Sequence, residues 1–211
     1  MVVVLISDTH ELENEVDVPD GDILIHCGDW TMFSKSHAAI EAFNVWLGDL
    51  PHRHKILVPG NHEAYLEEDR RRRNLTDNAT ILIEEAVTLE GLNFYGSPIT
   101  PLRGGAFGRS SPADRRRHWA RVPDDTHMLI SHGPPFGILD RSPGQDEPMG
   151  DPELLQRCRE LPELRLVCFG HIHGAYGMEE REGVLYVNAS LMGLEGELEH
   201  QPVALRLEPI T

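Results

Sequence analysis

The chain has 211 residues, of which 40% are hydrophobic, 35 acidic and 19 basic, so its formal net charge is −16. This length and apolar content predict a single globular domain, residues 1–211, with a substantial core. The acidic excess argues against long nucleic acids and anionic membranes as partners, because both attract basic surfaces, but it leaves open a phosphate substrate held through a metal.

The N-terminal segment "MVVVLISDTH" lacks the basic start and the long apolar stretch of a secretory signal. No later apolar run reaches the length needed to cross a bilayer. Cys27 and Cys168 lie inside apolar runs, where a buried, reduced thiol is expected. We therefore expect a cytoplasmic protein with no membrane partner.

Five apolar runs, each followed by a polar or glycine-containing turn, predict strands. "VVVLI" precedes "SDTH", "DILIHC" precedes "GDW", and "KILVP" precedes "GNHE". Further along, "HMLI" precedes "SHGPP" and "LRLVCF" precedes "GHIH". Continuous Val, Ile and Leu runs are typical of strands that are covered on both faces.

Helical patterns fill the intervals between these strands. Residues 34–50 carry apolar side chains along one helical face, at Ile40, Phe43, Leu47 and Leu50. Residues 151–158 begin with Asp151 as an N-cap and Pro152 at the first helical position. Alternation of strand and helix predicts a layered α/β fold.

The remaining apolar segments predict additional strands. Residues 80–99 read as short antiparallel strands with a turn at "LEGL", and residues 183–193 and 203–208 as further strands. At least eight strands are more than one simple doubly wound sheet holds. Two sheets packed face to face, with helices outside, would accommodate them.

Two arginine runs stand out in a chain that has only two lysines. They are "RRRR" at 70–73 and "RRR" at 115–117. Acidic residues lie close to both runs, at Glu67, Glu68, Asp69 and Asp114. We interpret both runs as solvated helix faces with local ion pairs rather than as substrate-binding groups.

Polar side chains follow the five predicted strand ends: Asp8 and His10, Asp29, Asn61 and His62, His132, and His171 and His173. Taken singly, each fits a turn, a helix cap or a satisfied histidine. Groups beyond the carboxyl ends of neighbouring strands converge on one crevice, and this set of carboxylates, imidazoles and one amide suits borderline divalent metals. On an extended strand, His171 and His173 would face the same side.

The ordered blocks "DTH", "GD", "GNHE", "SHG" and "GHIH" resemble the calcineurin-like metallophosphoesterase superfamily. The stretches "LIHCGDWT", "HGPPFGILD" and "YVNAS" are similar to its MPPED-type branch, the metallophosphoesterase-domain-containing proteins, and this similarity runs from about residue 3 to 192. The resemblance implies a four-layer αββα sandwich of two mixed sheets flanked by helices, with a two-metal centre at the strand ends.

By position, the resemblance implies one metal held by Asp8, His10, Asp29 and His173. It implies a second metal held by Asn61, His132, His171 and the bridging Asp29. His62 matches the non-ligand histidine that protonates the leaving oxygen or stabilises charge on the phosphate. We expect Mn²⁺, with Fe, Zn²⁺ and Co²⁺ as alternatives. The implied reaction is in-line attack by a metal-bridging hydroxide on a small phosphodiester, cyclic nucleotides included.

The chain departs from the superfamily pattern at one position and keeps it at another. Many members read GDxxD, where the last Asp supports the catalytic histidine, whereas this chain reads "GDWTM" with Met32 there. What orients His62 is therefore an open question. Some MPPED-type proteins carry Gly at the position of His171, so the histidine here predicts that both metal sites are complete.

Residues near the predicted site are candidates for substrate contact. Arg103 and Arg109 lie in the Gly/Pro-rich stretch 96–112 and could contact a phosphate or a purine. Phe136 and Tyr176 could offer stacking surfaces. The alternatives are exposed loop arginines without a partner and aromatic rings packed against their own loops.

Three other functions remain open from the sequence. One is a phosphomonoesterase or protein phosphatase that uses the same metals, and another is a nucleotide-binding regulatory module with weak catalysis. A DNA nuclease is the least expected, because it would need a basic face or an added capping domain. The sequence leaves the oligomeric state open.

Overall fold

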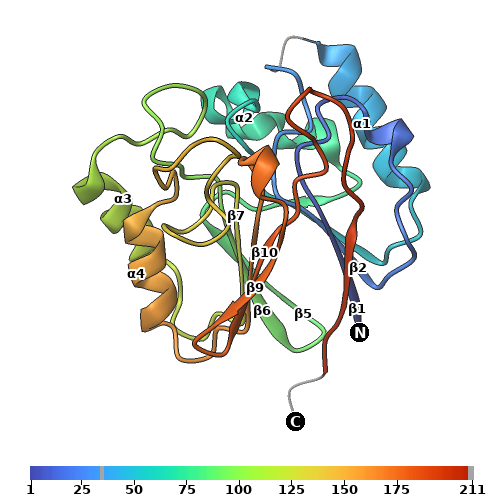
Figure 1. Cartoon of the computed structure of the whole chain (residues 1–211). Helices are drawn as coiled ribbons and strands as arrows, with labels where there is room; N and C mark the ends of the chain where they lie inside the picture. The colour runs from blue at the N-terminus through green and yellow to red at the C-terminus, as the bar shows by residue number, and fades with distance from the viewer. Residues whose placement is uncertain (34–35, 209–211) are drawn as a thin grey trace.

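The computed structural model describes residues 1–33 and 36–208, in which two β-sheets pack face to face between helices (Figure 1). In spatial order, the first sheet comprises β11 (Val203–Arg206), β1 (Val2–Ile6), β2 (Ile23–His26), β3 (His54–Leu57) and β4 (Thr80–Ile81). The second comprises β5 (Glu85–Leu89), β6 (Leu92–Ser97), β7 (Met128–Ser131), β8 (Leu166–Phe169), β10 (Val184–Asn188) and β9 (Gly177–Arg181).

Both sheets are mixed, as predicted. Strands β1 to β4 run parallel and β11 joins β1 antiparallel. In the second sheet β6, β7, β8 and β10 run parallel, while β5 and β9 are antiparallel edge strands. The predicted hairpin within residues 80–99 is confirmed for β5 and β6. Residues 80–81 instead extend the first sheet, so this segment crosses from one sheet to the other.

Alternate strand residues divide between two cores, because successive side chains point to opposite faces of a sheet. Val3 and Leu5 of β1 are fully buried between the sheets, together with Phe94 and Ile130 of the second sheet. Their neighbours on β1 belong to the outer core beneath the helices. Strands buried on both faces account for the unbroken apolar runs in the sequence.

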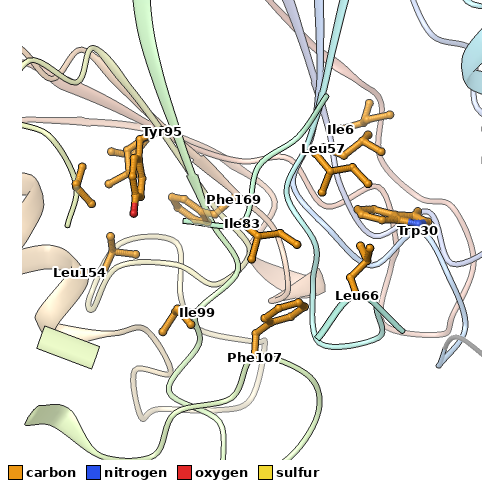
Figure 2. Close-up of a cluster of buried hydrophobic side chains, with 14 of the residues drawn as sticks. Ile6, Trp30, Leu57, Leu66, Ile83, Tyr95, Ile99, Phe107, Leu154 and Phe169 are labelled. Atoms are coloured by element: carbon orange, nitrogen blue, oxygen red, sulfur yellow. The ribbon is translucent and has the colours of Figure 1, made fainter. Parts of the chain in front are cut away.

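Helix α1 (His37–Asp49) covers the outer face of the first sheet, on the right in Figure 1. Ser36 caps it by accepting a hydrogen bond from the helix backbone. Its apolar face buries Phe43, whose ring is stacked on Trp30 with centroids 5.4 Å apart. Figure 2 shows Trp30 with Ile6 and Leu57, away from the side chains of the second sheet. The predicted helix began at residue 34, and residues 34–35 lie outside the described part of the chain.

Helices α3 (Pro112–Trp119) and α4 (Pro152–Glu160) cover the second sheet, on the left in Figure 1. Asp151 caps α4, as predicted, and also accepts hydrogen bonds from Arg115 Nε at 2.9 Å and Trp119 Nε1 at 2.7 Å. Arg115 is only 5% exposed, so its interpretation as a solvated residue is wrong. The reason is the buried carboxylate of Asp151, 36 residues away, which pairs with it.

The other arginines of the two runs lie at the surface as expected, in ion pairs with nearby or facing acidic residues. The short helix α2 (Ala64–Glu68) follows the third predicted strand end, and the 3-10 helices are Glu13–Glu15, Arg70–Thr76 and His173–Ala175. None of the described helices is both long and apolar enough to span a membrane.

Candidate metal centre

The carboxyl ends of β1, β2, β3, β7 and β8 bring the predicted polar residues to one edge of the sandwich. The two sheets are joined there directly. His171 follows β8 and Asp8 follows β1. The backbone N–H of His171 donates to Asp8 Oδ2 at 3.0 Å. His132 Nδ1, after β7, is 2.9 Å from the carbonyl oxygen of Cys27, after β2. Loops from both sheets therefore form a single site.

Asp8, His10 and His173 form the first cluster, in which the possible ligand atoms all lie within 4.8 Å of one another. His173 Nε2 is 3.5 Å from Asp8 Oδ1. His10 is 7% exposed, and its Nδ1 is buried without a hydrogen-bond partner among the described residues. A buried polar nitrogen without a partner lowers the stability of the fold. Coordination of a metal ion would satisfy it.

Asp29, His132 and His171 form the second cluster, with possible ligand atoms again within 4.8 Å of one another. His132 Nε2 lies 3.2 Å from Asp29 Oδ2 and 3.0 Å from Asn61 Oδ1. Asp29 also groups with His10 and His62. It is thus the carboxylate that faces both clusters, which is the position a bridging ligand needs.

The two histidines of "GHIH" do not lie on a strand, although both line the same cavity, as expected. β8 ends at Phe169, His171 adopts a φ of +69°, and a 3-10 helix begins at His173. This turn sends His171 to the cluster of Asp29 and His173 to the cluster of Asp8. Ile172 between them is buried, with 4% of its surface exposed.

Four of the seven predicted ligands have left-handed backbone conformations. The φ angles are +56° at Asp8, +44° at His10, +58° at Asp29 and +69° at His171. Each such conformation costs a non-glycine residue roughly 1–2 kcal/mol, and strain of this kind concentrates at functional sites. The surrounding fold stabilises these turns in spite of that cost.

Two glycines allow the loops to approach each other. A Cβ atom on Gly28, which has a φ of +111°, would lie 2.6 Å from His132 Nδ1. A Cβ atom on Gly60 would overlap the carboxylate of Asp29. Any side chain at either position would push the second cluster apart, so glycine is required for close approach.

Burial would raise the pKa of the Asp8 and Asp29 carboxyls, but the neighbouring imidazoles hold both below their usual range. His132 responds in the opposite sense, because Asp29 raises its pKa to about 9 in spite of burial. Burial lowers the pKa of His171 to about 4, so this ring is neutral. Two charged buried carboxylates among imidazoles, one of them neutral, form a donor set that fits divalent cations.

The ring of His62 is held by Phe33 rather than by the usual carboxylate. The Phe33 N–H donates to His62 Nδ1 at 3.3 Å, and the two rings are stacked with centroids 4.0 Å apart. A donor at Nδ1 leaves Nε2 as the nitrogen that carries the proton. Burial also lowers the pKa of His62. The backbone amide of Phe33, the residue after Met32, thus orients the His62 ring. A pattern of side chains in the sequence does not reveal such an interaction.

Glu63 was missed in the sequence as a residue that organises the site. It is fully buried and accepts hydrogen bonds from the backbone N–H groups of Asp29 (2.9 Å), Thr31 (3.0 Å) and Gly60 (2.7 Å), and from Thr31 Oγ1 (2.9 Å). Burial, together with the charge of Asp29, raises its pKa to about 7. Its place in the "GNHE" block was the available signal. It joins the loop that carries Asp29 to the loop before Asn61.

His26, at the end of β2, is a second buried residue that connects loops of the site and that the sequence did not reveal. Its Nδ1 accepts the Gly28 N–H at 3.2 Å, which leaves Nε2 to donate to Thr9 Oγ1 at 3.1 Å. Burial lowers its pKa to about 3, so the ring stays neutral. Thr9 lies between two predicted ligands of the first cluster and Gly28 directly precedes Asp29, so His26 connects the loops that carry the two clusters.

A cavity of about 340 Å³ opens over the clusters. It is lined by His10, Asp29, Met32, Asn61, His62, His171, His173, Met192 and Gly196. The four predicted substrate residues are not among these described lining residues.

The four predicted substrate residues, Arg103, Arg109, Phe136 and Tyr176, either contact other side chains or are exposed to solvent. Arg109 pairs with Glu67 at 3.1 Å, and Tyr176 stacks on His200 with centroids 4.3 Å apart. Phe136 is 39% exposed, and Arg103 lies in an exposed loop. Their contact with substrate stays a prediction.

Comparison with known proteins gives a consistent result. Residues 1–175 match the family described as calcineurin-like phosphoesterase. The UPF0046 protein K07C11.7 of Caenorhabditis elegans is 35% identical over 95% of this chain and 73% of its own length. Metallophosphoesterase domain-containing protein 1 of Homo sapiens is 31% identical over 97% of this chain and 70% of its own.

Solved structures share the fold at low sequence identity. One superposes with a TM-score of 0.66 at 16% identity and covers 89% of both chains. TT1561 of Thermus thermophilus superposes with a TM-score of 0.59 at 14% identity and covers 89% of this chain and 88% of its own. These likenesses concern the fold alone.

Proposed function

This chain belongs to the calcineurin-like phosphoesterase family, and from that premise we propose that it is a metal-dependent phosphodiesterase acting on small phosphodiesters, cyclic nucleotides among them. The observation that carries the proposal is the pair of carboxylate–imidazole clusters that both face Asp29. A single cluster would suit one structural ion. Two clusters that meet at one carboxylate suit a pair of ions close enough to act on the same phosphate.

In this proposal Asp8, His10, Asp29 and His173 hold one ion, and Asn61, His132, His171 and Asp29 hold the other. When bound, two divalent ions supply a water nucleophile at neutral pH and offset the negative charge of the phosphoryl group. Mn²⁺ is the ion we expect, with Fe, Zn²⁺ and Co²⁺ as the alternatives, since a site of oxygen and imidazole ligands can take any of the four.

The residues of the chain supply alignment and a proton. The backbone N–H of His62 donates to Asp29 Oδ1 at 2.9 Å, which fixes the carboxylate while Oδ2 faces His132. The His62 ring lines the cavity and carries its proton on Nε2, since Nδ1 accepts from Phe33. We propose that this Nε2–H donates to the leaving oxygen as the ester bond breaks.

The charge of the cavity supports a diester over a monoester. No arginine or lysine is among the described residues that line it. A monoester carries two negative charges near neutral pH and gains from extra cationic groups, whereas a diester carries one. The described lining therefore supports the proposed choice of a singly charged phosphate, and the kinetics below test it.

Hydrolysis of bis(p-nitrophenyl) phosphate by Mn²⁺-loaded protein tests the proposal. Asp29→Ala removes the carboxylate shared by both clusters and should lower kcat/KM at least about 10³-fold, as expected for a group that holds both ions. Met178→Ala is the control, because Met178 is an exposed residue of β9 outside the cavity. Turnover retained in Asp29→Ala would contradict the mechanism. A higher kcat/KM on p-nitrophenyl phosphate would instead favour a phosphomonoesterase.

A further inference from the structure

Apolar side chains gather at the cavity over the metal clusters. Met32 and Met192 line it directly. The ring of Phe33 stacks on His62, another lining residue. Leu194 lies beside the turn that follows His173, since a Cβ on Gly174 would be 3.1 Å from Leu194 Cδ2. Met32, Phe33, Met192 and Leu194 are called the apolar rim below.

Three of the four rim residues are exposed to water. Met32 is 43% exposed, Phe33 is 54% exposed and Leu194 is 57% exposed. These are three of the six large hydrophobic residues exposed in the described chain. Met32 lines the cavity, Phe33 stacks on the lining residue His62, and Leu194 lies in the chain between the lining residues Met192 and Gly196. Scattered exposed apolar residues need no explanation, but a group beside a cavity marks a binding surface.

Met32 occupies the position where the superfamily pattern has an acidic residue. Its backbone N–H donates to Glu11 Oε1 at 2.8 Å, which fixes the turn, and its side chain lines the cavity. The thioether is flexible and makes favourable contacts with aromatic rings. The substitution that left His62 without its usual carboxylate therefore adds apolar surface at the mouth of the site.

Three acidic residues lie near the rim in the described part of the chain. Gly196 lines the cavity between Glu195 and Glu197, which are both exposed, and Glu11 lies next to the Met32 backbone. A substrate with a second phosphate or a carboxylate would meet like charge there. A neutral apolar group can instead contact the methionine, phenylalanine and leucine side chains of the rim.

We propose that the apolar rim is a subsite for the neutral aromatic or aliphatic ester groups of a singly charged phosphodiester. The inference rests on the proposed function and specifies its substrate class. The metal clusters bind the phosphate, and the rim removes the ester groups from water. Phosphodiesters with small or additionally charged ester groups bind less tightly.

Calorimetric titration of the Mn²⁺-loaded protein with two slowly reacting diesters tests the subsite. Diphenyl phosphate and dimethyl phosphate carry the same single charge, so their difference in Kd reports the ester groups. Burial of phenyl groups should make diphenyl phosphate bind at least roughly tenfold more tightly. A carboxylate on one phenyl ring should weaken binding roughly tenfold through the adjacent acidic residues.

Exposed rim residues can be replaced with little effect on folding. The double variant Met32→Ala, Leu194→Ala should reduce the preference for diphenyl over dimethyl phosphate roughly fivefold, since two contact surfaces are lost. Met178→Ala removes an even more exposed methionine outside the described lining of the cavity and should leave the preference unchanged. Equal Kd values for the two diesters, or an unchanged preference in the double variant, would overturn the subsite.

The same protein preparation separates this inference from the proposed function. If the protein hydrolyses bis(p-nitrophenyl) phosphate but binds the two diesters equally well, the proposed subsite is refuted and the proposed phosphodiesterase activity is supported. Loss of the preference in the double variant, in a protein without turnover, would support the rim as a ligand subsite and refute the catalytic proposal.

Discussion

Glu63→Gln tests whether one buried carboxylate holds the loops of the metal centre together. The two oxygens of Glu63 accept four hydrogen bonds, three of them from backbone N–H groups. A glutamine offers one oxygen and one NH₂ group in the same volume. Asp29 N and Gly60 N share one carboxylate oxygen, while the two donors of Thr31 share the other. In either orientation of the amide, an NH₂ group faces at least one backbone donor.

The magnitude follows from the number of buried donors that lose their acceptor. Each unsatisfied buried N–H costs about 1–3 kcal/mol, and one or two are expected here. We therefore expect the free energy of unfolding to fall by about 2–4 kcal/mol. For a domain of this size that corresponds to a Tm lower by roughly 5–15 °C.

Metal affinity distinguishes this role from general stabilisation. The donors belong to the loop of Asp29 and the loop before Asn61, so their displacement should weaken Mn²⁺ binding as well as folding. Urea unfolding with and without Mn²⁺, and calorimetric Mn²⁺ titration, measure the two effects. Glu68→Gln is the matched control, because Glu68 is an exposed residue of α2 that pairs only loosely with Arg72 at 3.5 Å. Unfolding and Mn²⁺ affinity equal to those of the unmodified protein would refute the reasoning.

Three further predictions test other parts of the structure. Arg115→Met should lower the free energy of unfolding by about 3–5 kcal/mol in urea, because it leaves a buried carboxylate unpaired, whereas Arg117→Met at the surface should change it by about 0.5 kcal/mol or less. In metal-free protein the pKa of His132 is about 9 against a usual 6.5, so the stability it contributes is complete below pH 6.5 and is lost as pH rises through 9. Mn²⁺ must displace that proton, so calorimetric titrations from pH 7 to 8.5 should show affinity rising about tenfold per unit, and a pH-independent affinity would contradict the shift. His171→Ala and His173→Ala should each abolish a different class of Mn²⁺ site, and loss of the same class in both would contradict the two clusters.

The layered fold could be predicted because its signals are local. Apolar runs in β1, β2 and β3 reflect burial on both faces, and the Asp–Pro start of α4 is a helix cap. Arg115 could not be predicted from its neighbours in the chain, because Asp151 lies 36 residues away and burial decides the pairing. The same holds for residues 80–81, whose sheet is decided by the partner strand β3.

The sequence by itself determined the residue types of the candidate site and their order, because short motifs at strand ends require no knowledge of long-range contacts. Only the tertiary structure decided how those residues are divided and supported. The left-handed turn at His171 separates the "GHIH" histidines into two clusters, and the Phe33 amide orients His62. Glu63 connects two loops through backbone donors. Backbone amides carry no signature in the amino-acid sequence, and contacts between distant loops exist only after both sheets have packed.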